Sequence, residues 1–402
     1  MRVAIFHNLP SGGAKRALWG TVKYLSRAGC SIDVFVPSTA NEDFLPLRQF
    51  ANSVTVMPLH TTPFGLAKSA IKYLFPRGFL SLADQEEAQK KLADIINRGK
   101  YDIVFVEQDR YTMSPFILKY LVLPYVYYCQ QPRRSNEAIL KILGEKIETN
   151  LVEKAWTEYC IPRLDSIDRE NASYAKMILS NSCFSSEAIL RAYGKNSFVS
   201  YLGVDTQLFR PLKMEREPYV LSVGSMAPEK GFDFIIRALG LVDKAIRPGL
   251  IIVGNVARAA YRDYLERLAT EKGVDLEIKI LIDDLELTGL YNKAQLCVYA
   301  PFLEPFGLVP LEAMACGTPV VAVREGGVRE SVVHNESGLL TDRDEQKFAD
   351  AITELLLDKE KYQYMSGKAI EIVSNFWTCE KAVQRLIQHM RYSIKNAMSR
   401  DR

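Results

Sequence analysis

The sequence lacks several features that define specialised protein classes. Its seven cysteines are an odd number and include no C-x-x-C pair, which argues against a disulfide framework and a zinc site and fits a reducing compartment. Only four apolar residues, 3–6, precede polar His7 and Asn8, too few for a signal-peptide core. No apolar run reaches the roughly 18 residues of a membrane-spanning helix. We therefore expect a cytoplasmic protein whose contact with a membrane, if it has one, is peripheral and at the inner face.

The chain also has little net charge. Its 51 lysines and arginines stand against 48 aspartates and glutamates, a balance that identifies no partner. No nucleic-acid-binding signature is present, so we expect no nucleic acid. The 402 residues, 48% of them hydrophobic, suffice for two large domains or three small ones.

Short apolar runs alternate with helical patterns in two series. This alternation is typical of βαβ units on a parallel sheet with both faces covered. The polar stretch 209–218 between the series reads as a linker. We predict an α/β protein of two doubly wound, Rossmann-like domains, residues 1–208 and 209–377. The runs are 3–7, 32–36, 54–57, 101–106, 125–129 and 177–180, then 219–223, 250–253, 278–282, 296–299 and 320–323.

Residues 60–80 interrupt the first series with a basic, aromatic segment that contains no acidic residue. A segment of this composition can rest in a membrane interface. The alternative is an inserted helix that covers the core or a binding cleft.

A glycine-containing turn follows the first strand of each series. Gly12 and Gly13 precede a helix expected from Lys15 to Arg27, where backbone amides can meet an anion. They do not form G-x-G-x-x-G, which disfavours a nicotinamide dehydrogenase, and they can equally be a tight βα connection. In the second series, Lys230 stands at the opening of a helix, where its ammonium would neutralise a phosphate unless it is an ordinary surface lysine.

The strongest candidate for chemistry is the segment 302–317. Glu304 precedes a Pro-Phe-Gly turn, and Glu312, eight positions later (312 minus 304), lies in the helix that the turn starts. A carboxylate can accept hydrogen bonds from the vicinal hydroxyls of a ribose or hexose. The spacing therefore predicts a site for sugar hydroxyls beside a helix N-terminus.

This segment, with the strand 319–322 and Glu325-Gly326-Gly327 after it, resembles the E-x7-E signature of retaining, nucleotide-sugar-dependent glycosyltransferases of the GT-B fold (glycosyl transferases group 1). The likeness spans nearly the whole chain, since the Gly12-Gly13 turn and the segment 228–231 resemble that family's glycine loop and diphosphate lysine loop. It implies two Rossmann-like domains facing a central cleft, an N-terminal acceptor domain and a C-terminal donor domain. It also implies a terminal helix, about 378–402, that crosses back to the first domain.

The resemblance assigns roles to individual residues. Glu304 would contact the donor sugar near the reacting carbon, Glu312 would hold the ribose hydroxyls, and Lys230 would bind the diphosphate. The remaining positions would contact the donor chiefly through the backbone: Phe306, Gly307 and Leu308 at the distal phosphate or sugar, Ile282 at the base, and Gly12 and Gly13 at the diphosphate.

Two positions depart from the family pattern. Ser225 stands where an arginine is usual, which removes a phosphate contact of roughly 1.5 to 3 kcal/mol, or about 10- to 150-fold in affinity. Gln130 stands where the family often has histidine; it can donate and accept hydrogen bonds but carries no charge. A retaining front-face mechanism tolerates this change, because the leaving phosphate can take the acceptor's proton. We therefore place Gln130 with Glu304 and Lys230 among the catalytic candidates, the alternative being a polar residue that merely ends a strand.

One motif raises the question of a metal. Asp342-Arg343-Asp344 matches the D-x-D string of sugar transferases with another fold, but its place before an expected helix favours N-capping. We expect no metal and no other cofactor, with Lys230 and a helix dipole taking the cation's role.

The sequence thus predicts a retaining glycosyltransferase. It would move a hexose-type sugar from a nucleoside diphosphate, UDP in preference to GDP, to a saccharide or lipid-linked acceptor in polysaccharide or glycolipid synthesis. Two alternatives stay open. One is a nucleotide-binding scaffold without turnover, suggested by Ser225 and Gln130, and the other is a sugar phosphorylase that uses inorganic phosphate.

Overall fold

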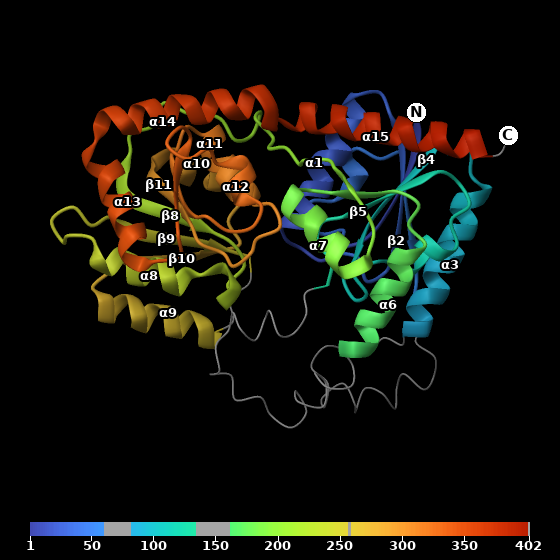
Figure 1. Cartoon of the computed structure of the whole chain (residues 1–402), viewed down its shortest axis with the longest axis horizontal. Helices are drawn as coiled ribbons and strands as arrows, with labels where there is room; N and C mark the ends of the chain where they lie inside the picture. Colours follow the sequence, from blue (N-terminus) through green and yellow to red (C-terminus); the bar gives the residue numbers. More distant parts are fainter. Residues whose placement is uncertain (60–81, 134–160, 256–258, 401–402) are drawn as a thin grey trace. The chain divides into compact units, whose positions relative to one another are not determined.

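The computed structural model describes residues 1–59, 82–133, 161–255 and 259–400, which form two compact units (Figure 1). Unit 1 comprises Met1–Asn181, Ser185–Ser200 and Val383–Arg402, and unit 2 comprises Ser182–Phe184 and Tyr201–Ala382. Apart from Ser182–Phe184, unit 2 begins at Tyr201, earlier than the change of domain that we placed at residue 209. The segment 60–80 lies outside the described residues. No helix in the described part is long and apolar enough to cross a membrane.

Unit 1 is built on a seven-stranded parallel sheet with the order β3-β2-β1-β4-β5-β6-β7. Its inner strands are almost wholly buried, which is why they appear in the sequence as continuous apolar runs. The strands are β1 (Arg2–Asn8), β2 (Ser31–Pro37), β3 (Ser53–Met57), β4 (Ile103–Asp109), β5 (Tyr125–Cys129), β6 (Ile178–Ser180) and β7 (Phe198–Val199).

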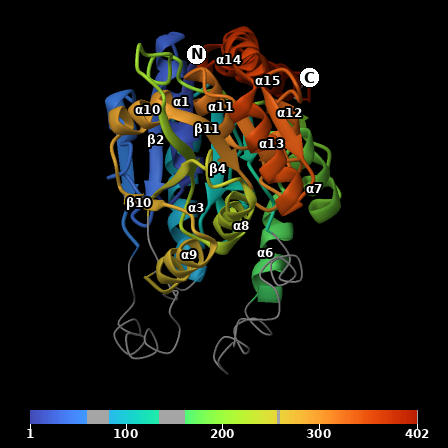
Figure 2. The same cartoon turned by 90° about the vertical axis from the view of Figure 1, so that its left-hand side faces the viewer.

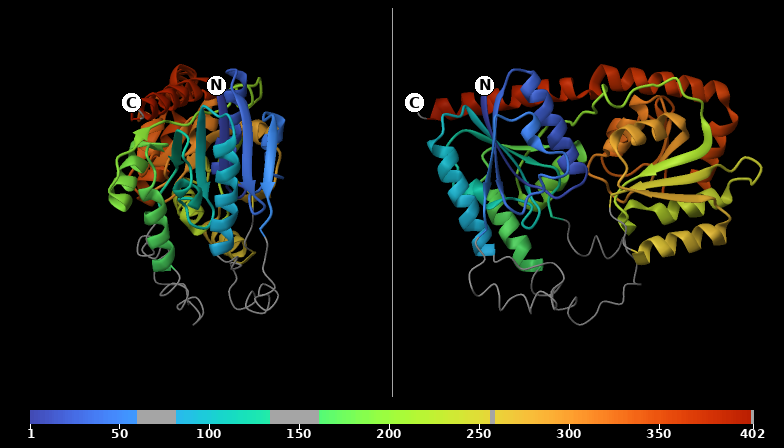
Figure 3. Two further views of the ribbon diagram at one scale, coloured as in Figure 1. Left: turned by 90° about the vertical axis from the view of Figure 1, so that its right-hand side faces the viewer. Right: turned by 180° about the vertical axis from the view of Figure 1, so that it is seen from behind.

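Helices cover the sheet of unit 1. Leu92 and Ile96 of α3 pack with Ala4 and Phe6 of β1 in one apolar cluster, and Figure 3 shows α3 running along the strands. Residues 3 and 5 point to the opposite face by the alternation of a strand and are also fully buried. The helices are α1 (Gly13–Arg27), η1 (Leu47–Gln49), α3 (Leu82–Arg98), η2 (Phe116–Lys119), α6 (Ile161–Ser173), α7 (Cys183–Tyr193) and α15 (Cys379–Arg400).

The last helix, α15, returns the chain to unit 1. Its Ser393 hydroxyl donates to the Tyr125 carbonyl at 3.1 Å, and the rings of His389 and Tyr392 each lie 5.8 Å from the Phe198 ring. Phe198 belongs to β7, a two-residue strand that the sequence did not reveal because it is too short to form a pattern.

Unit 2 is built on a six-stranded parallel sheet with the order β10-β9-β8-β11-β12-β13. The strands are β8 (Glu217–Val223), β9 (Gly249–Gly254), β10 (Leu276–Ile280), β11 (Ala294–Tyr299), β12 (Val320–Val323) and β13 (Gly338–Thr341). The helices are η4 (Pro228–Lys230), α8 (Phe232–Leu241), α9 (Ala259–Lys272), α10 (Asp284–Lys293), α11 (Leu308–Ala315), α12 (Val328–Ser331), α13 (Glu345–Leu357), α14 (Lys359–Ile372) and η5 (Val373–Trp377).

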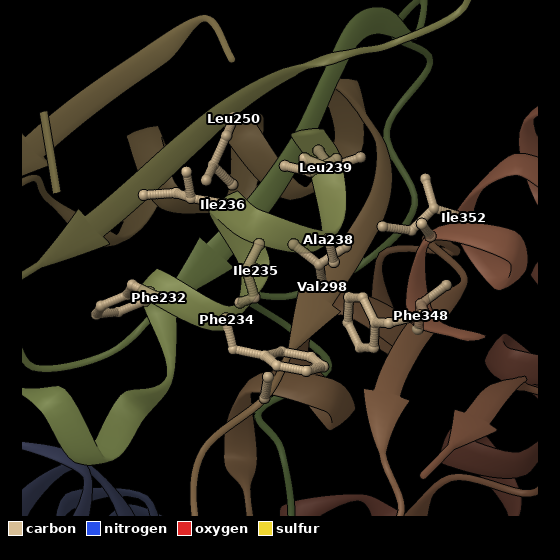
Figure 4. Close-up of a cluster of buried hydrophobic side chains, with 14 of the residues drawn as sticks. Phe232, Phe234, Ile235, Ile236, Ala238, Leu239, Leu250, Val298, Phe348 and Ile352 are labelled. Atoms are coloured by element: carbon tan, nitrogen blue, oxygen red, sulfur yellow. The ribbon is translucent and has the colours of Figure 1, made fainter. Parts of the chain in front are cut away.

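The core of unit 2 centres on α8, which is apolar on most of its surface. It packs beside α9 (Figure 2), and its side chains meet Leu250, Val298 and Ile352 (Figure 4). The Phe234 and Phe348 rings form an edge-to-face pair with centroids 5.3 Å apart. Asp233 and Arg237 pair with each other one turn apart on α8, and burial against both the sheet and neighbouring helices explains why the rest of the helix is mostly apolar.

Each sheet reverses its strand order beside its first strand. In unit 1, β1 lies between β2 and β4; in unit 2, β8 lies between β9 and β11. Ligands of open parallel sheets bind beyond the carboxyl ends of the strands at such a switch point. The topology therefore directs attention to the turns after β1, β4, β8 and β11.

Candidate active site

An ion pair lies at the switch point of unit 2. Lys230, from the turn after β8, donates through Nζ to Glu304 Oε2 at 2.7 Å, and Glu304 comes from the turn after β11. The two side chains are 22% and 21% exposed, so both remain accessible to a ligand. The sequence singled out both residues, and the structure brings them into contact.

The turns that carry this pair are joined by their backbones. The Phe302 amide donates to the Glu229 carbonyl at 2.9 Å. Gly231 has a φ of +68°, and a Cβ there would lie 2.2 Å from the Ala300 carbonyl oxygen. Glycine follows the lysine because no side chain fits where the two turns meet. Lys230 lies in the 3-10 turn η4, and α8 begins two residues later, at Phe232.

Arg343 supports the turn that carries Glu304. Its guanidinium donates to the carbonyls of Ala300 and Pro301, both at 2.9 Å, and makes two bonds of 2.8 Å to the Glu325 carboxylate. It also lies 3.7 Å from the centroid of the Phe302 ring. This residue comes from the Asp342-Arg343-Asp344 string, so the arginine between the aspartates organises the site.

The helix-capping role that we expected of this string is confirmed for Asp344. The Asp344 side chain caps α13 by accepting from the Lys347 amide at 2.9 Å, and Asp342 pairs with the Lys347 ammonium at 2.7 Å. Among the described residues, no group of three or more histidine, cysteine or acidic side chains is arranged to hold a metal ion.

Two glycines fix the backbone of Glu304. The Gly327 amide donates to the Glu304 carbonyl at 2.8 Å. Gly326 has a φ of +62°, and a Cβ there would lie 2.2 Å from the same carbonyl oxygen. The Glu325-Gly326-Gly327 segment after β12 is therefore the support on which Glu304 rests.

The second glutamate lies deeper. Glu312 on α11 is only 4% exposed, and it accepts a hydrogen bond of 2.8 Å from the Tyr291 hydroxyl. Gly307, at a φ of +92°, is the N-cap residue of α11, so no side chain caps the first amides of this helix. Buried Phe306 lies before it, and Leu308 is the first residue of the helix.

The other donor-site candidates of unit 2 also lie beyond strand ends. Ser225 is in the turn after β8, where its carbonyl accepts from the Ala227 amide at 2.7 Å. Ile282 lies between β10 and α10, next to Asp283, which caps α10 by accepting from the Glu286 amide at 2.8 Å. The position of Ile282 leaves its backbone outside the sheet ladder.

In unit 1, the glycine turn leads directly into α1. Gly12 has a φ of +139° and precedes the helix. Gly13 is the first residue of the helix, and a Cβ there would meet nothing within 4 Å. One turn on, the fully buried Lys15 ammonium contacts the Glu42 carboxylate. His7 Nε2 lies 2.9 Å from the same Glu42 oxygen, and burial lowers the pKa of His7 to about 4, so the imidazole is neutral at pH 7.

Glu107, near the end of β4, and Gln130, directly after β5, form a buried polar pair. Gln130 Nε2 lies 3.3 Å from both Glu107 carboxylate oxygens. Burial raises the pKa of Glu107 to about 8. The neighbouring Asp109 is also buried and accepts from the Asn8 and Gln89 side chains at 2.7 and 3.0 Å. These groups line the carboxyl edge of the unit 1 sheet.

Sequence reasoning missed several of these residues. Glu107 and Asp109 carried a usable signal, since they follow the apolar run 103–106 at the end of a strand. The Lys15–Glu42 and Tyr291–Glu312 contacts join residues 27 and 21 positions apart, and nothing in the local sequence indicates such partners.

Comparison with known proteins gives matches over both units. Residues 204–372 match the family model described as glycosyl transferases group 1. A GDP-mannose-dependent alpha-(1-6)-phosphatidylinositol monomannoside mannosyltransferase of Mycobacterium tuberculosis is 27% identical over 270 residues, 60% of this chain and 67% of that protein. A D-inositol 3-phosphate glycosyltransferase of Catenulispora acidiphila is 30% identical over 249 residues, 56% of this chain and 59% of that protein. The chain thus spans about three fifths to two thirds of these relatives.

Solved structures resemble the whole chain. Sucrose-phosphate synthase from Thermosynechococcus elongatus has a TM-score of 0.73 and 21% identity, covering 97% of this chain and 98% of that one. Anabaena HepE, solved with UDP and glucose, has a TM-score of 0.74 and 20% identity, covering 97% and 99%. At this level of identity the likeness establishes the fold.

Proposed function

We propose that this chain, which has the GT-B fold and whose residues 204–372 match the model of the glycosyl transferases group 1, is a retaining glycosyltransferase that uses a nucleoside diphosphate hexose. The acceptor in this proposal is a saccharide or a lipid-linked saccharide. The proposal takes UDP as the expected carrier; GDP is the alternative, because the mycobacterial relative is named as GDP-mannose-dependent.

The Lys230–Glu304 ion pair at the switch point carries the proposal. A lysine ammonium has three protons, so Lys230 can bind a diphosphate oxygen without losing Glu304. Glu304 would then present its carboxylate to hydroxyls of the donor sugar next to the diphosphate. The 2.7 Å contact supports this proposal, because it holds the ammonium and the carboxylate side by side.

The proposed transfer needs no protein base. The acceptor oxygen bonds to the anomeric carbon while the bond from that carbon to the diphosphate oxygen breaks. The departing diphosphate takes the acceptor's proton on the same face of the sugar, so the configuration is retained. Lys230 and the N-terminus of α11 stabilise the negative charge that develops on the leaving group. In this mechanism they act in place of a metal ion.

The test is calorimetric titration of UDP and GDP, with a chelator present, into the wild type and three variants. We expect Lys230→Ala and Glu312→Ala to weaken nucleotide binding by about 10- to 100-fold, because each loses a charged hydrogen bond. Glu304→Gln should keep nucleotide binding and lose transfer. Lys368→Ala is the matched control, since its 2.8 Å pair with Glu371 lies on α14 away from the strand ends.

Transfer is then measured with UDP-hexoses and GDP-mannose, and the anomeric configuration of the product is determined by NMR. Inversion of configuration would overturn the retaining mechanism. Nucleotide binding with no consumption of any donor sugar would favour a scaffold without turnover. Cleavage of a disaccharide that depends on inorganic phosphate would favour a phosphorylase.

A further inference from the structure

The hydroxyl of Tyr291 is aimed at the second glutamate of the site. Tyr291 lies on α10 and is fully buried, and its hydroxyl oxygen is 2.8 Å from Glu312 Oε2 on α11. Burial and the nearby Glu312 carboxylate raise the pKa of Tyr291 well above its usual range. The tyrosine therefore keeps its proton at any working pH and acts as the donor.

Tyr291 is held both through its ring and through its main-chain carbonyl. Its ring makes an edge-to-face contact with Phe209, with centroids 5.8 Å apart. Its carbonyl accepts from Arg216 Nη1 at 3.0 Å and from the Thr318 hydroxyl at 2.6 Å. The carbonyl bonds fix the backbone of Tyr291 and the Phe209 contact restrains its ring, which keeps the hydroxyl beside Glu312.

The stretch that contacts Tyr291 is the one expected to be a linker. Phe209 is 2% exposed, and the Leu212 amide donates to Asn292 Oδ1 at 2.7 Å. Arg216 also donates to the Ala294 and Gly317 carbonyls, both at 2.8 Å. The stretch is thus bound along the α10 side of unit 2 and forms part of the support for Tyr291.

We propose that Tyr291 is a positioning residue that makes the nucleotide site select ribose over deoxyribose. A glutamate side chain has three rotatable bonds, and a charge-assisted hydrogen bond to one oxygen restricts the direction in which the carboxylate can accept further bonds. Tyr291 thereby directs Glu312 toward the two ribose hydroxyls. This inference rests on the proposed function and on the role that the family resemblance implies for Glu312, which is to hold the ribose hydroxyls.

The experiment compares binding of UDP with 2′,3′-dideoxy-UDP, and of GDP with 2′,3′-dideoxy-GDP, by calorimetry. We expect the wild type to prefer the ribose form, and Tyr291→Phe to weaken binding of that form by about tenfold without changing the dideoxy form. Phenylalanine keeps the ring contact and both carbonyl bonds. Tyr219→Phe is the matched control: it removes a buried hydroxyl that donates to the Leu290 carbonyl at 2.8 Å, and it should change neither ligand.

A double-mutant cycle provides the second test. In a Glu312→Gln background, Tyr291→Phe should have no further effect on the ribose form, because the carboxylate that it positions is gone. An equal weakening of both ligand forms by Tyr291→Phe would overturn the inference in favour of a purely structural hydroxyl, and so would equal losses in both backgrounds. A wild type that binds ribose and dideoxyribose forms equally would instead overturn the proposed role of Glu312.

Discussion

Two acidic residues of unit 1, Glu42 in the loop after β2 and the fully buried Glu107 in β4, have different surroundings. Glu42 meets a lysine and a histidine, and these partners lower its pKa to about 2 despite the opposing effect of burial. Glu107 meets the amide of Gln130 and its own neighbour's backbone amide, and burial dominates. A buried carboxylate without a cation favours its protonated form, so the two sites respond to pH in opposite directions.

The first prediction at this scale concerns Glu107. Its pKa is raised from 4.5 to about 8 in the folded chain, so the folded state holds a proton that the unfolded state releases above pH 4.5. The stability from this group is complete below pH 4.5 and is lost as pH rises toward 8. Between pH 6 and pH 9 the wild type should lose up to about 3 kcal/mol relative to Glu107→Gln, whose side chain does not titrate.

Urea unfolding of both proteins at pH 6, 7.5 and 9 measures this difference. His7, whose pKa is lowered to about 4 in the folded chain, is present in both proteins, so its contribution cancels in the comparison. Parallel stability curves for the wild type and Glu107→Gln across this range would show that Glu107 ionises with its ordinary pKa.

At the scale of elements, the site is an assembly of turns supported by other turns. Glu304 is placed by Gly327, by the Arg343 contacts with Ala300 and Pro301, and by the bond from Phe302 to Glu229. The turns after β8, β11 and β12 therefore form one unit, and a change in one of them shifts the others.

Gly326→Ala tests this coupling. The added methyl would meet the Glu304 carbonyl at 2.2 Å, at a φ of +62° that alanine disfavours. We expect kcat/KM for transfer to fall at least about 100-fold, because a shift of about 1 Å in a positioning group costs that much. Nucleotide binding should fall less than about tenfold, since Glu312 lies on α11, outside these coupled turns.

Gly367→Ala is the control for that substitution. Gly367 is in α14, its φ is not positive, and a Cβ there would meet nothing within 4 Å. This variant should keep full activity and gain about 0.5 to 1 kcal/mol of stability. Equal losses of transfer and nucleotide binding in Gly326→Ala would mean that the change unfolds the site as a whole.

The elements were predicted well from the sequence, and their partners were not. Buried parallel strands have a local signal, so the expected runs 32–36 and 320–323 fall within or on observed strands. The stretch 209–218 misled because prolines and charges look like a linker. Its role depends on which carbonyls of α10 and β11 accept from Arg216, and those carbonyls belong to residues 75 and 78 positions away from it.

The site shows the same division. The sequence and the family resemblance selected Lys230, Glu304 and Glu312, whose spacing is local. Gln130 was selected without Glu107, its contact in the folded chain, because that contact is created by the pairing of β4 with β5. Arg343 was not selected as a site residue, because the aspartates on either side of it matched the D-x-D metal motif and only they were considered. Its five contacts exist only once the strands of unit 2 are assembled.

At the scale of the whole molecule, neither unit is one continuous stretch of chain. Ser182–Phe184 belong to unit 2, where the Glu330 carboxylate accepts from the Cys183 and Phe184 amides at 2.8 and 2.9 Å. The end of the chain belongs to unit 1. The two folds are therefore interleaved in sequence, and a cut at one place removes part of a distant core.

This interleaving predicts the effect of ending the chain after Ala382. Unit 1 would lose the buried side chains of Val383, Leu386 and Met390, at about 1.5 to 3 kcal/mol each, a large part of the 5 to 15 kcal/mol that stabilises a domain. Every residue proposed to bind the nucleotide from unit 2 would remain. Calorimetry should show the unfolding transition of unit 1 shifted to lower temperature or lost, and nucleotide affinity within about threefold of the wild type.

The control is a chain ended after Ile394. This truncation removes mostly exposed residues, so the protein should behave like the full chain. An unchanged unit 1 transition after the longer truncation would show that α15 contributes little to that unit.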